Sequence, residues 1–150
     1  MPSNINYWLA IGATDILGAQ PGSCTFWCLP STATSEDRVY MYVPRGQCGR
    51  RHGICGLCSI KAPPKGNHKL EHICRPYTAY GKKLMYTELV VQHVYTNPLT
   101  AKMMKYDFQL SQANFVRRNF QGTLFPLSKS HAMHIDRLVH KVNQTDSEFK

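Results

Sequence analysis

Residues 39–43 read Val-Tyr-Met-Tyr-Val, and residues 84–96 read Leu-Met-Tyr-Thr-Glu-Leu-Val-Val-Gln-His-Val-Tyr-Thr. In the first stretch, Val39, Met41 and Val43 alternate with two tyrosines, which is the period of two expected for a β-strand. The second stretch is rich in β-branched and aromatic residues and contains neither glycine nor proline, which favours one long strand. Both stretches therefore predict β-strands.

The segments around these two strands predict the remaining elements. Further strands are expected over residues 6–12 and 53–61, a short apolar stretch covers 24–29, and residues 114–127 read as two short strand-like pieces around a turn. Helices are expected over residues 13–20 (one or two turns), 99–106 (with a Thr or Asn cap) and 130–143, whose apolar residues have helical spacing. Residues 62–83 are expected to form a long, exposed and mobile loop. This order predicts a mixed α+β domain, a small closed or half-closed barrel flanked by helices.

Length and composition indicate one domain. The chain has 150 residues, of which 43% are hydrophobic and 18% charged, which is typical of a globular protein with one core. We assign the domain to residues 1–143 and expect residues 144–150 to form a polar, disordered tail. No apolar run approaches the ~20 residues that cross a bilayer, and no signal peptide is recognised. We therefore expect an intracellular protein, in the cytoplasm, nucleoid or nucleus, that is neither secreted nor bound to a membrane.

The positive charge is concentrated in one part of the chain. The formal net charge is +9, yet residues 1–37 contain three acids and no Lys or Arg. Residues 38–83 contain ten Lys and Arg against a single acid, Glu71. Basic residues interleaved with aromatic and histidine side chains favour a polyanionic partner such as DNA or RNA. The alternative is a basic surface that serves only solubility.

The six cysteines raise the question of zinc or disulfides. Cys55 and Cys58 have the C-x-x-C spacing, and the side chains that could complete a zinc site are His52, His68, His72 and Cys74. On a strand, however, residues three apart point to opposite faces, so we predict no metal site. A reducing compartment argues against disulfides, and the thiols are expected to pack as small hydrophobic groups. A zinc-stabilised interaction module remains an alternative.

No enzyme motif is recognised. The sequence lacks a nucleophile elbow, a phosphate-binding P-loop, a dinucleotide fingerprint and a His-Glu-x-x-His zinc motif. The adjacent Glu36 and Asp37 are expected to be solvated, and His93, His131 and His134 are expected to be structural. We therefore predict no catalytic residue and no cofactor. A Cys/His-dependent enzyme acting on nucleic acid stays as an alternative.

Five segments, in order along nearly the whole chain, resemble the EVE domain of the PUA-like superfamily, to which the YTH domains also belong. They are residues 6–12, 26–28, 36–42, 53–60 and 117–125. The third segment resembles the family pattern G-D-x-V-x-x-Y, with Glu36 where glycine is commoner. The resemblance implies a PUA-like β-barrel of about five to six strands flanked by helices. It also implies a pocket that takes a modified base flipped out of its strand.

The resemblance assigns the residues of this pocket. Trp27 matches the tryptophan that walls the cage in YTH domains, and the backbone of Cys28 would lie beside the edge of the base. YTH domains carry a second tryptophan in the loop after the strand that matches residues 53–60, whereas this chain offers Tyr77 and Tyr80 there. The implied polar pocket residues are Asp15, Asn119 and Gln121. The basic residues expected to bind phosphate are Arg50, Arg51, Lys61, Arg117 and Arg118.

The expected function is recognition of a modified base in DNA or RNA without chemistry on that base. EVE domains are associated with modified DNA bases such as 5-methylcytosine, and YTH domains with N6-methyladenine in RNA. Such a module would direct a partner nuclease or defence protein to its target. The alternatives are a PUA-like RNA-binding domain without selectivity for modification, a core position for Trp27, and a helix-capping role for Asp15.

Overall fold

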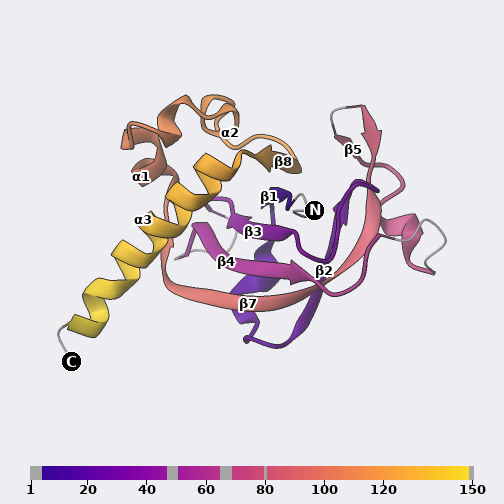
Figure 1. Ribbon diagram of the computed structural model, residues 1–150, viewed down its shortest axis with the longest axis horizontal. Helices are drawn as coiled ribbons and strands as arrows, with labels where there is room; N and C mark the ends of the chain where they lie inside the picture. Colours follow the sequence, from indigo (N-terminus) through magenta and orange to yellow (C-terminus); the bar gives the residue numbers. More distant parts are fainter. Residues whose placement is uncertain (1–4, 47–50, 65–68, 80, 149–150) are drawn as a thin grey trace.

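A curled six-stranded sheet forms the centre of the computed structural model, which describes residues 5–46, 51–64, 69–79 and 81–148 (Figure 1). The strand order is β2-β7-β4-β3-β1-β8; β1 and β3 are parallel, and the other neighbouring pairs are antiparallel. The strands are β1 (Tyr7–Ile11), β2 (Cys24–Leu29), β3 (Arg38–Val43), β4 (Gly53–Ile60), β7 (Met85–Leu99) and β8 (Leu124–Leu127). The sheet curls into a half-barrel, so the predicted mixed α+β architecture is confirmed.

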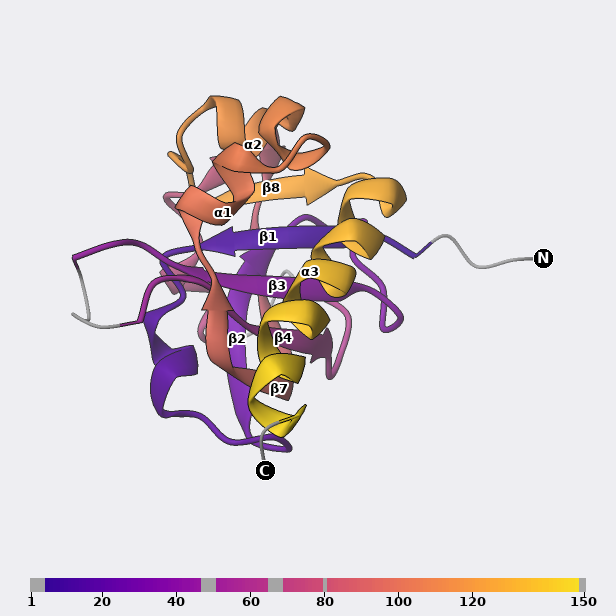
Figure 2. The same ribbon diagram turned by 90° about the vertical axis from the view of Figure 1, so that its left-hand side faces the viewer.

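Helices cover one face of the sheet. They are α1 (Ala101–Tyr106), α2 (Asn114–Arg117) and α3 (Lys129–Glu148), together with the short 3₁₀ helix η3 (Leu110–Gln112). Two further 3₁₀ helices lie on the other face: η1 (Thr14–Gly18), which buries Ile16 there, and η2 (Glu71–Ile73), which leads into the buried Cys74. Figure 2 shows α3 lying across the strands, with α1 and α2 gathered near β8. Thr100 caps α1, because its hydroxyl accepts a hydrogen bond from Met103 N at 3.2 Å. Helix α3 extends past residue 143 through residue 148.

The alternating pattern of β3 separates two hydrophobic clusters. Tyr40 and Tyr42 pack with the helices on one face, whereas Val39, Met41 and Val43 pack inside the curl. This confirms the two faces predicted from residues 39–43. None of the helices in the described part of the chain is long and apolar enough to cross a membrane.

Strand β7 continues beyond residue 96, where the predicted strand ended, as far as Leu99. Val94 pairs with Gly56 and Leu99 with Ile54, so several residues of β7 bulge opposite one residue of β4. Within this bulge, Asn143 of α3 accepts from Asn97 N at 2.9 Å and donates to Asn97 O at 3.0 Å. Because α3 supplies these hydrogen bonds to the backbone, the strand tolerates Pro98, which has no N–H to donate to a neighbouring strand.

Two local predictions were wrong. The first strand-like piece expected within 114–127 is helix α2, which buries Phe115 and Val116 against the core; only the second piece, β8, is a strand. Within the segment expected to be a loop, the described residues 69–79 and 81–83 contain η2 and a pair of short strands, β5 (Thr78–Ala79) and β6 (Lys82–Lys83).

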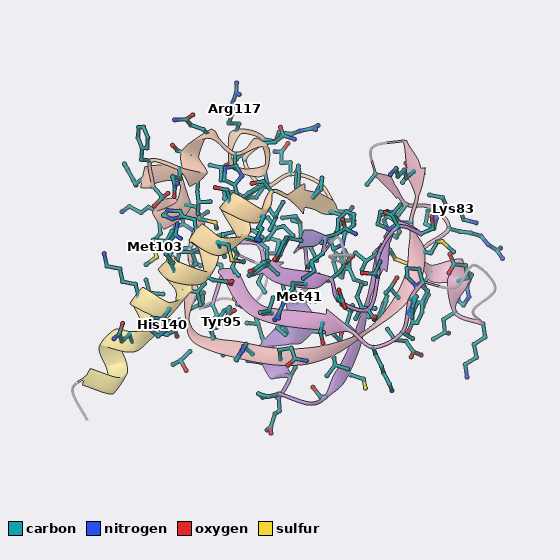
Figure 3. The ribbon with its side chains drawn as sticks, viewed as in Figure 1. Met41, Lys83, Tyr95, Met103, Arg117 and His140 are labelled. Carbon is teal, nitrogen blue, oxygen red and sulfur yellow. A yellow bond between two sulfur atoms is a disulfide. The ribbon has the colours of Figure 1, made fainter. Side chains whose placement is uncertain are left out.

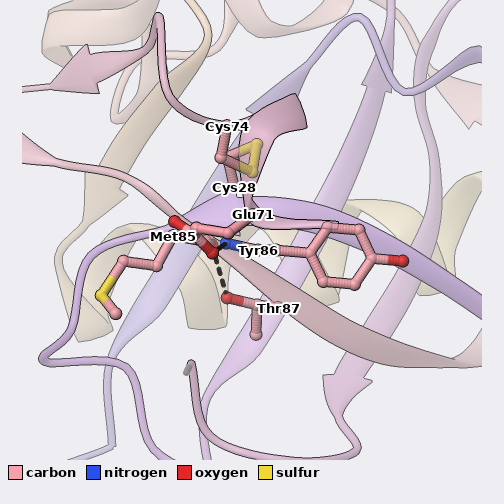
Figure 4. Close-up of a disulfide and its surroundings, with 6 residues drawn as sticks. All are labelled: Cys28, Glu71, Cys74, Met85, Tyr86 and Thr87. Carbon is pink, nitrogen blue, oxygen red and sulfur yellow. Dashed lines mark hydrogen bonds between the residues drawn. A yellow bond between two sulfur atoms is a disulfide. The ribbon is translucent and has the colours of Figure 1, made fainter. Parts of the chain in front are cut away.

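The expectation that all cysteines are reduced was wrong for one pair. Cys28 of β2 and Cys74, directly after η2, form a disulfide with Cα atoms 5.6 Å apart (Figure 4). Beside it, Glu71 accepts a hydrogen bond from Tyr86 N at 2.8 Å and so fastens η2 to β7. These two contacts hold segment 71–77 on the sheet.

The argument used against a shared C-x-x-C site was also wrong. Cys55 and Cys58 both belong to the cluster inside the curl, because a bulge of β4 at Cys55, opposite β3, breaks the strict alternation between them. No group of three His, Cys, Asp or Glu side chains that could hold a metal is found in the described ranges, and His68 lies outside them.

Asp37 is buried rather than solvated. Its carboxylate is 0% exposed and accepts five hydrogen bonds, from Asn6 N and Nδ2, Thr34 N and Oγ1, and Trp8 Nε1. It thereby joins the start of β1 to the turn before β3. Glu36, by contrast, is exposed as expected.

Candidate functional site

A cavity of about 240 Å³ lies beside β2, at the end of β1. Its walls come from four separate segments: the end of β1, the middle of β2, the stretch that follows η2, and the loop before β8. The lining residues are Ile11, Phe26, Trp27, Cys28, Ile73, Tyr77 and Thr123. The cavity thus brings together three residues predicted for the base pocket.

Trp27 separates this cavity from a smaller hollow of about 60 Å³. The ring is partly buried, and its Nε1 is a buried donor without a partner among the described residues. Leaving such a group unpaired costs about 1–3 kcal/mol. Gly12, at φ +104°, lines the hollow, and a Cβ there would lie 3.9 Å from Trp27 Cη2. Asp15 also borders the hollow, with its side chain exposed.

The Cys28–Cys74 disulfide joins two walls of the cavity. Cys28 follows Trp27 on β2, and Cys74 follows Ile73 on the opposite wall. Tyr77 N donates to Cys74 O at 3.0 Å, and Leu84 N donates to Tyr77 O at 3.2 Å. The Tyr77 side chain is 44% exposed at this position. Sequence reasoning missed this link because two cysteines 46 residues apart carry no local signal of pairing.

The other predicted pocket residues do not line the cavity. Asn119 and Gln121 are exposed on the loop between α2 and β8, from which only Thr123 reaches the cavity. Tyr80 lies outside the described residues.

The predicted phosphate-binding residues are dispersed. Arg117 and Arg118 are exposed at the end of α2, and Figure 3 shows Arg117 pointing away from the sheet. Lys61 is exposed near Cys24, its Nζ 3.7 Å from the sulfur. Arg51 donates to the Tyr95 carbonyl of β7, so its guanidinium has a structural partner. Arg50 lies outside the described residues.

None of the described groups with clearly shifted pKa values lines the cavity, although Tyr86 stacks on Phe26 of its wall, with ring centroids 4.8 Å apart. Burial raises the pKa of Tyr40, Tyr95 and Tyr86, and a hydrogen bond of 2.6 Å to Asp136 raises that of Tyr40 further. Burial also raises the pKa of Tyr42 and of the Cys58 thiol to about 12 each. These shifts reflect packing on the sheet.

Asp107 is held between α1 and α3. Partial burial favours a higher pKa for its carboxyl, but hydrogen bonds from Leu110 N, His134 and Gln109 N outweigh this and lower it. His134 Nε2 lies 2.8 Å from Asp107 Oδ1, which gives the histidine the structural role expected for it.

Comparison with known proteins identifies the fold alone. No family model matches the sequence, and no curated protein matches it. Similar solved structures include a hypothetical protein from Leishmania major, 17% identical over 92% of this chain and 96% of that chain, with a TM-score of 0.64. A protein from Pseudomonas putida is 16% identical over 89% and 99%, with a TM-score of 0.65, and one from Pseudomonas syringae is 19% identical over 89% and 99%, with a TM-score of 0.60. The architecture is therefore shared over nearly the whole length of each.

Proposed function

We propose that this protein is an EVE-type domain with a PUA-like barrel that binds a modified base, flipped out of DNA or RNA, in the cavity beside Trp27. The observation that carries the proposal is the convergence of Trp27, Cys28 and Tyr77 on one cavity. These residues come from β2 and from a segment about 50 residues later, and the resemblance to EVE and YTH domains implies each of them at the pocket.

The size of the cavity supports a single base as its ligand. About 240 Å³ equals roughly eight water molecules at ~30 Å³ each, and is below the ~300–1,000 Å³ of pockets for drug-sized ligands. Trp27 and Tyr77 supply aromatic surfaces, and stacking contributes about 1–3 kcal/mol per base. The indole N–H of Trp27 is a donor that an acceptor on the base can satisfy after a small shift of the ring.

Tyr77, the second aromatic side chain proposed to stack on the base, favours a cytosine-derived base. In the loop where YTH domains carry a second tryptophan, this chain offers tyrosines, of which Tyr77 lines the cavity, so N6-methyladenine is the less favoured ligand. DNA is favoured over RNA, because the sequence resembles EVE domains more closely than YTH domains. The protein would then act as a targeting module whose partner, a nuclease or defence protein, supplies the chemistry.

A titration by fluorescence polarisation at fixed salt tests the proposal. The probes are matched oligonucleotides with cytosine, 5-methylcytosine, 5-hydroxymethylcytosine, adenine or N6-methyladenine, each as DNA and as RNA. We expect at least a tenfold preference for one modified base, equivalent to about 1.4 kcal/mol. Uniform affinity that collapses with added salt would instead support the PUA-like RNA-binding domain without selectivity.

Trp27→Ala tests the role of the cavity. We expect this variant to lose the preference for the modified probe while keeping weak, salt-sensitive binding. Phe108→Ala is the matched control, because Phe108 is 83% exposed and does not line the cavity. Equal loss on modified and unmodified probes, with an unchanged circular dichroism spectrum, would contradict the cage.

A further inference from the structure

A second concave site lies on the opposite face of the sheet. It is a cleft of about 610 Å³ between the end of β3, helix α1 and the loop before β8. Tyr42 lines this cleft and packs with the helix-side cluster, whereas the preceding Met41 lines the hollow at Trp27 and packs inside the curl. Successive residues of a strand point to opposite faces, so the cleft and the Trp27 cavity are separate sites.

The cleft has an unbalanced positive charge. Arg45, Lys102 and Lys105 line it together with His52, and its described lining residues include no carboxylate. The first three side chains are exposed, and none forms an ion pair or hydrogen bond with another described residue. Unpaired positive charges around a concave surface concentrate the potential that attracts phosphate. None of Arg45, Lys102 and Lys105 is among the residues predicted from the sequence to bind phosphate.

An unusual backbone forms the wall of the cleft. Asn119 and Phe120 both have positive φ, 55° and 58°. Asn119 ends α2 in the left-handed conformation that asparagine commonly adopts at a helix C-terminus, whereas the same conformation is costly for Phe120. Phe120 is held there by stacking on Tyr42, with ring centroids 4.7 Å apart and planes at 6°, and by a hydrogen bond of 2.8 Å from its N to Phe115 O. The exposed Asn119 is thereby presented at the cleft. Strained backbone maintained in this way is concentrated at ligand sites.

An exposed aromatic ring completes the cleft. Tyr106, the last residue of α1, is 83% exposed and lines the same wall as Lys102 and Lys105. An aromatic ring with this much free surface offers a stacking partner for a planar base, and every base has such a face. Cationic groups and a stacking surface on one helix suit a ligand that carries both a phosphate and a base.

We propose that this cleft is a nucleotide-binding site, in which Arg45, Lys102 and Lys105 hold a phosphate and Tyr106 stacks on the base. The nucleotide is either a free mononucleotide or one unit of a single strand, since both present the same chemistry. The site does not depend on recognition of a modified base at Trp27.

Binding of three unmodified probes separates these sources. We would titrate the protein with AMP, with inorganic phosphate and with a single-stranded oligodeoxythymidine, following amide shifts by NMR. Shifts at α1 with AMP identify a site for free nucleotides, and shifts with the oligonucleotide alone identify a strand-binding site. Absence of shifts at α1 with both AMP and the oligonucleotide would overturn the proposal.

Variants that remove charge test whether the cleft binds the nucleotide. The double variant Lys102→Ala/Lys105→Ala is expected to weaken binding at least tenfold and, for the oligonucleotide, to reduce the salt slope by roughly 0.7 for each lysine removed. Lys82→Ala/Lys83→Ala removes the same charge from exposed β6, far from α1 in Figure 3, and is the matched control. An equal loss in both double variants would overturn the proposal in favour of general electrostatic attraction.

Two further variants separate the ligand groups and the two sites. Tyr106→Ala is expected to weaken AMP or oligonucleotide binding and to leave phosphate binding unchanged. Trp27→Ala should keep the shifts at α1 with each probe, whatever it does to oligonucleotide binding at the other cavity, so failure of the modified-base proposal and failure of this one are distinguishable. Loss of the α1 shifts in Trp27→Ala would contradict two separate sites.

Discussion

Replacing Asp37 with alanine is expected to destabilise the protein more than most single substitutions. The carboxylate is fully buried and accepts hydrogen bonds from Asn6, Thr34 and Trp8. These donors lie on two segments that the chain must bring together before β1 can pair with β3. The substitution therefore removes a link between distant segments as well as a charged acceptor.

The expected cost follows from what the donors can do afterwards. The donors of Asn6 and Thr34 are only partly buried, so water can replace the carboxylate as their acceptor, and losing these hydrogen bonds costs little. Trp8 is 7% exposed, and its Nε1 would be left buried without an acceptor, at a cost of about 1–3 kcal/mol. With the lost charge-assisted bonds, at about 1.5–3 kcal/mol each but not additive, we expect a total of about 3–5 kcal/mol.

Urea unfolding followed by circular dichroism measures this loss. With a slope of about 2 kcal/mol per molar urea, the midpoint of Asp37→Ala should fall by about 2 M. Asp37→Asn keeps one acceptor oxygen and should lose roughly half as much. Glu36→Ala removes the neighbouring exposed carboxylate and should change stability by less than about 0.5 kcal/mol. If Asp37→Ala costs no more than Glu36→Ala, the carboxylate does not anchor β1 and the reasoning is refuted.

Two further predictions concern the cysteines and alkaline pH. The double variant Cys28→Ser/Cys74→Ser should lower the free energy of unfolding by about 2–4 kcal/mol, since the disulfide closes a separation of 46 residues. Cys24→Ser, which removes a free thiol, should leave it unchanged. A wild-type urea midpoint that reductant does not change would count against the disulfide. Burial raises the pKa of Tyr42 from 10.0, and that of Cys58 from 9.0, to about 12, so the unfolded chain releases these protons first. The contribution of these two groups to the free energy of unfolding should be fully present below about pH 9 and should fall as the pH rises towards 12. The fall is roughly 1.4 kcal/mol for each unit between the folded and unfolded pKa values. Urea midpoints at pH 8 and 11 measure this, Tyr42→Phe should reduce the fall, and equal midpoints would show that the phenol and the thiol titrate alike in both states.

Part of the candidate site was predictable from the sequence. Trp27, Cys28 and Tyr77 were expected together from the resemblance to EVE and YTH domains, and they line one cavity. The placement of Asn119 was not predictable, because two consecutive left-handed residues turn it towards the cleft at α1. Nor did the basic stretch indicate Lys102 and Lys105, since they belong to a different segment that the fold brings beside Arg45.

The sequence alone determined the elements whose signal is local. Alternation along residues 39–43 identified both a strand and its two faces, and helical spacing over residues 130–143 identified α3, because these patterns depend only on backbone geometry. Tertiary structure decided what depends on distant partners. The bulge of β4 at Cys55 places Cys55 and Cys58 in one cluster, Cys28 pairs with Cys74, and Asp37 is buried against Trp8 and Asn6 at the start of the chain. Contacts between residues far apart in sequence leave no periodic trace, so only the folded chain determines them.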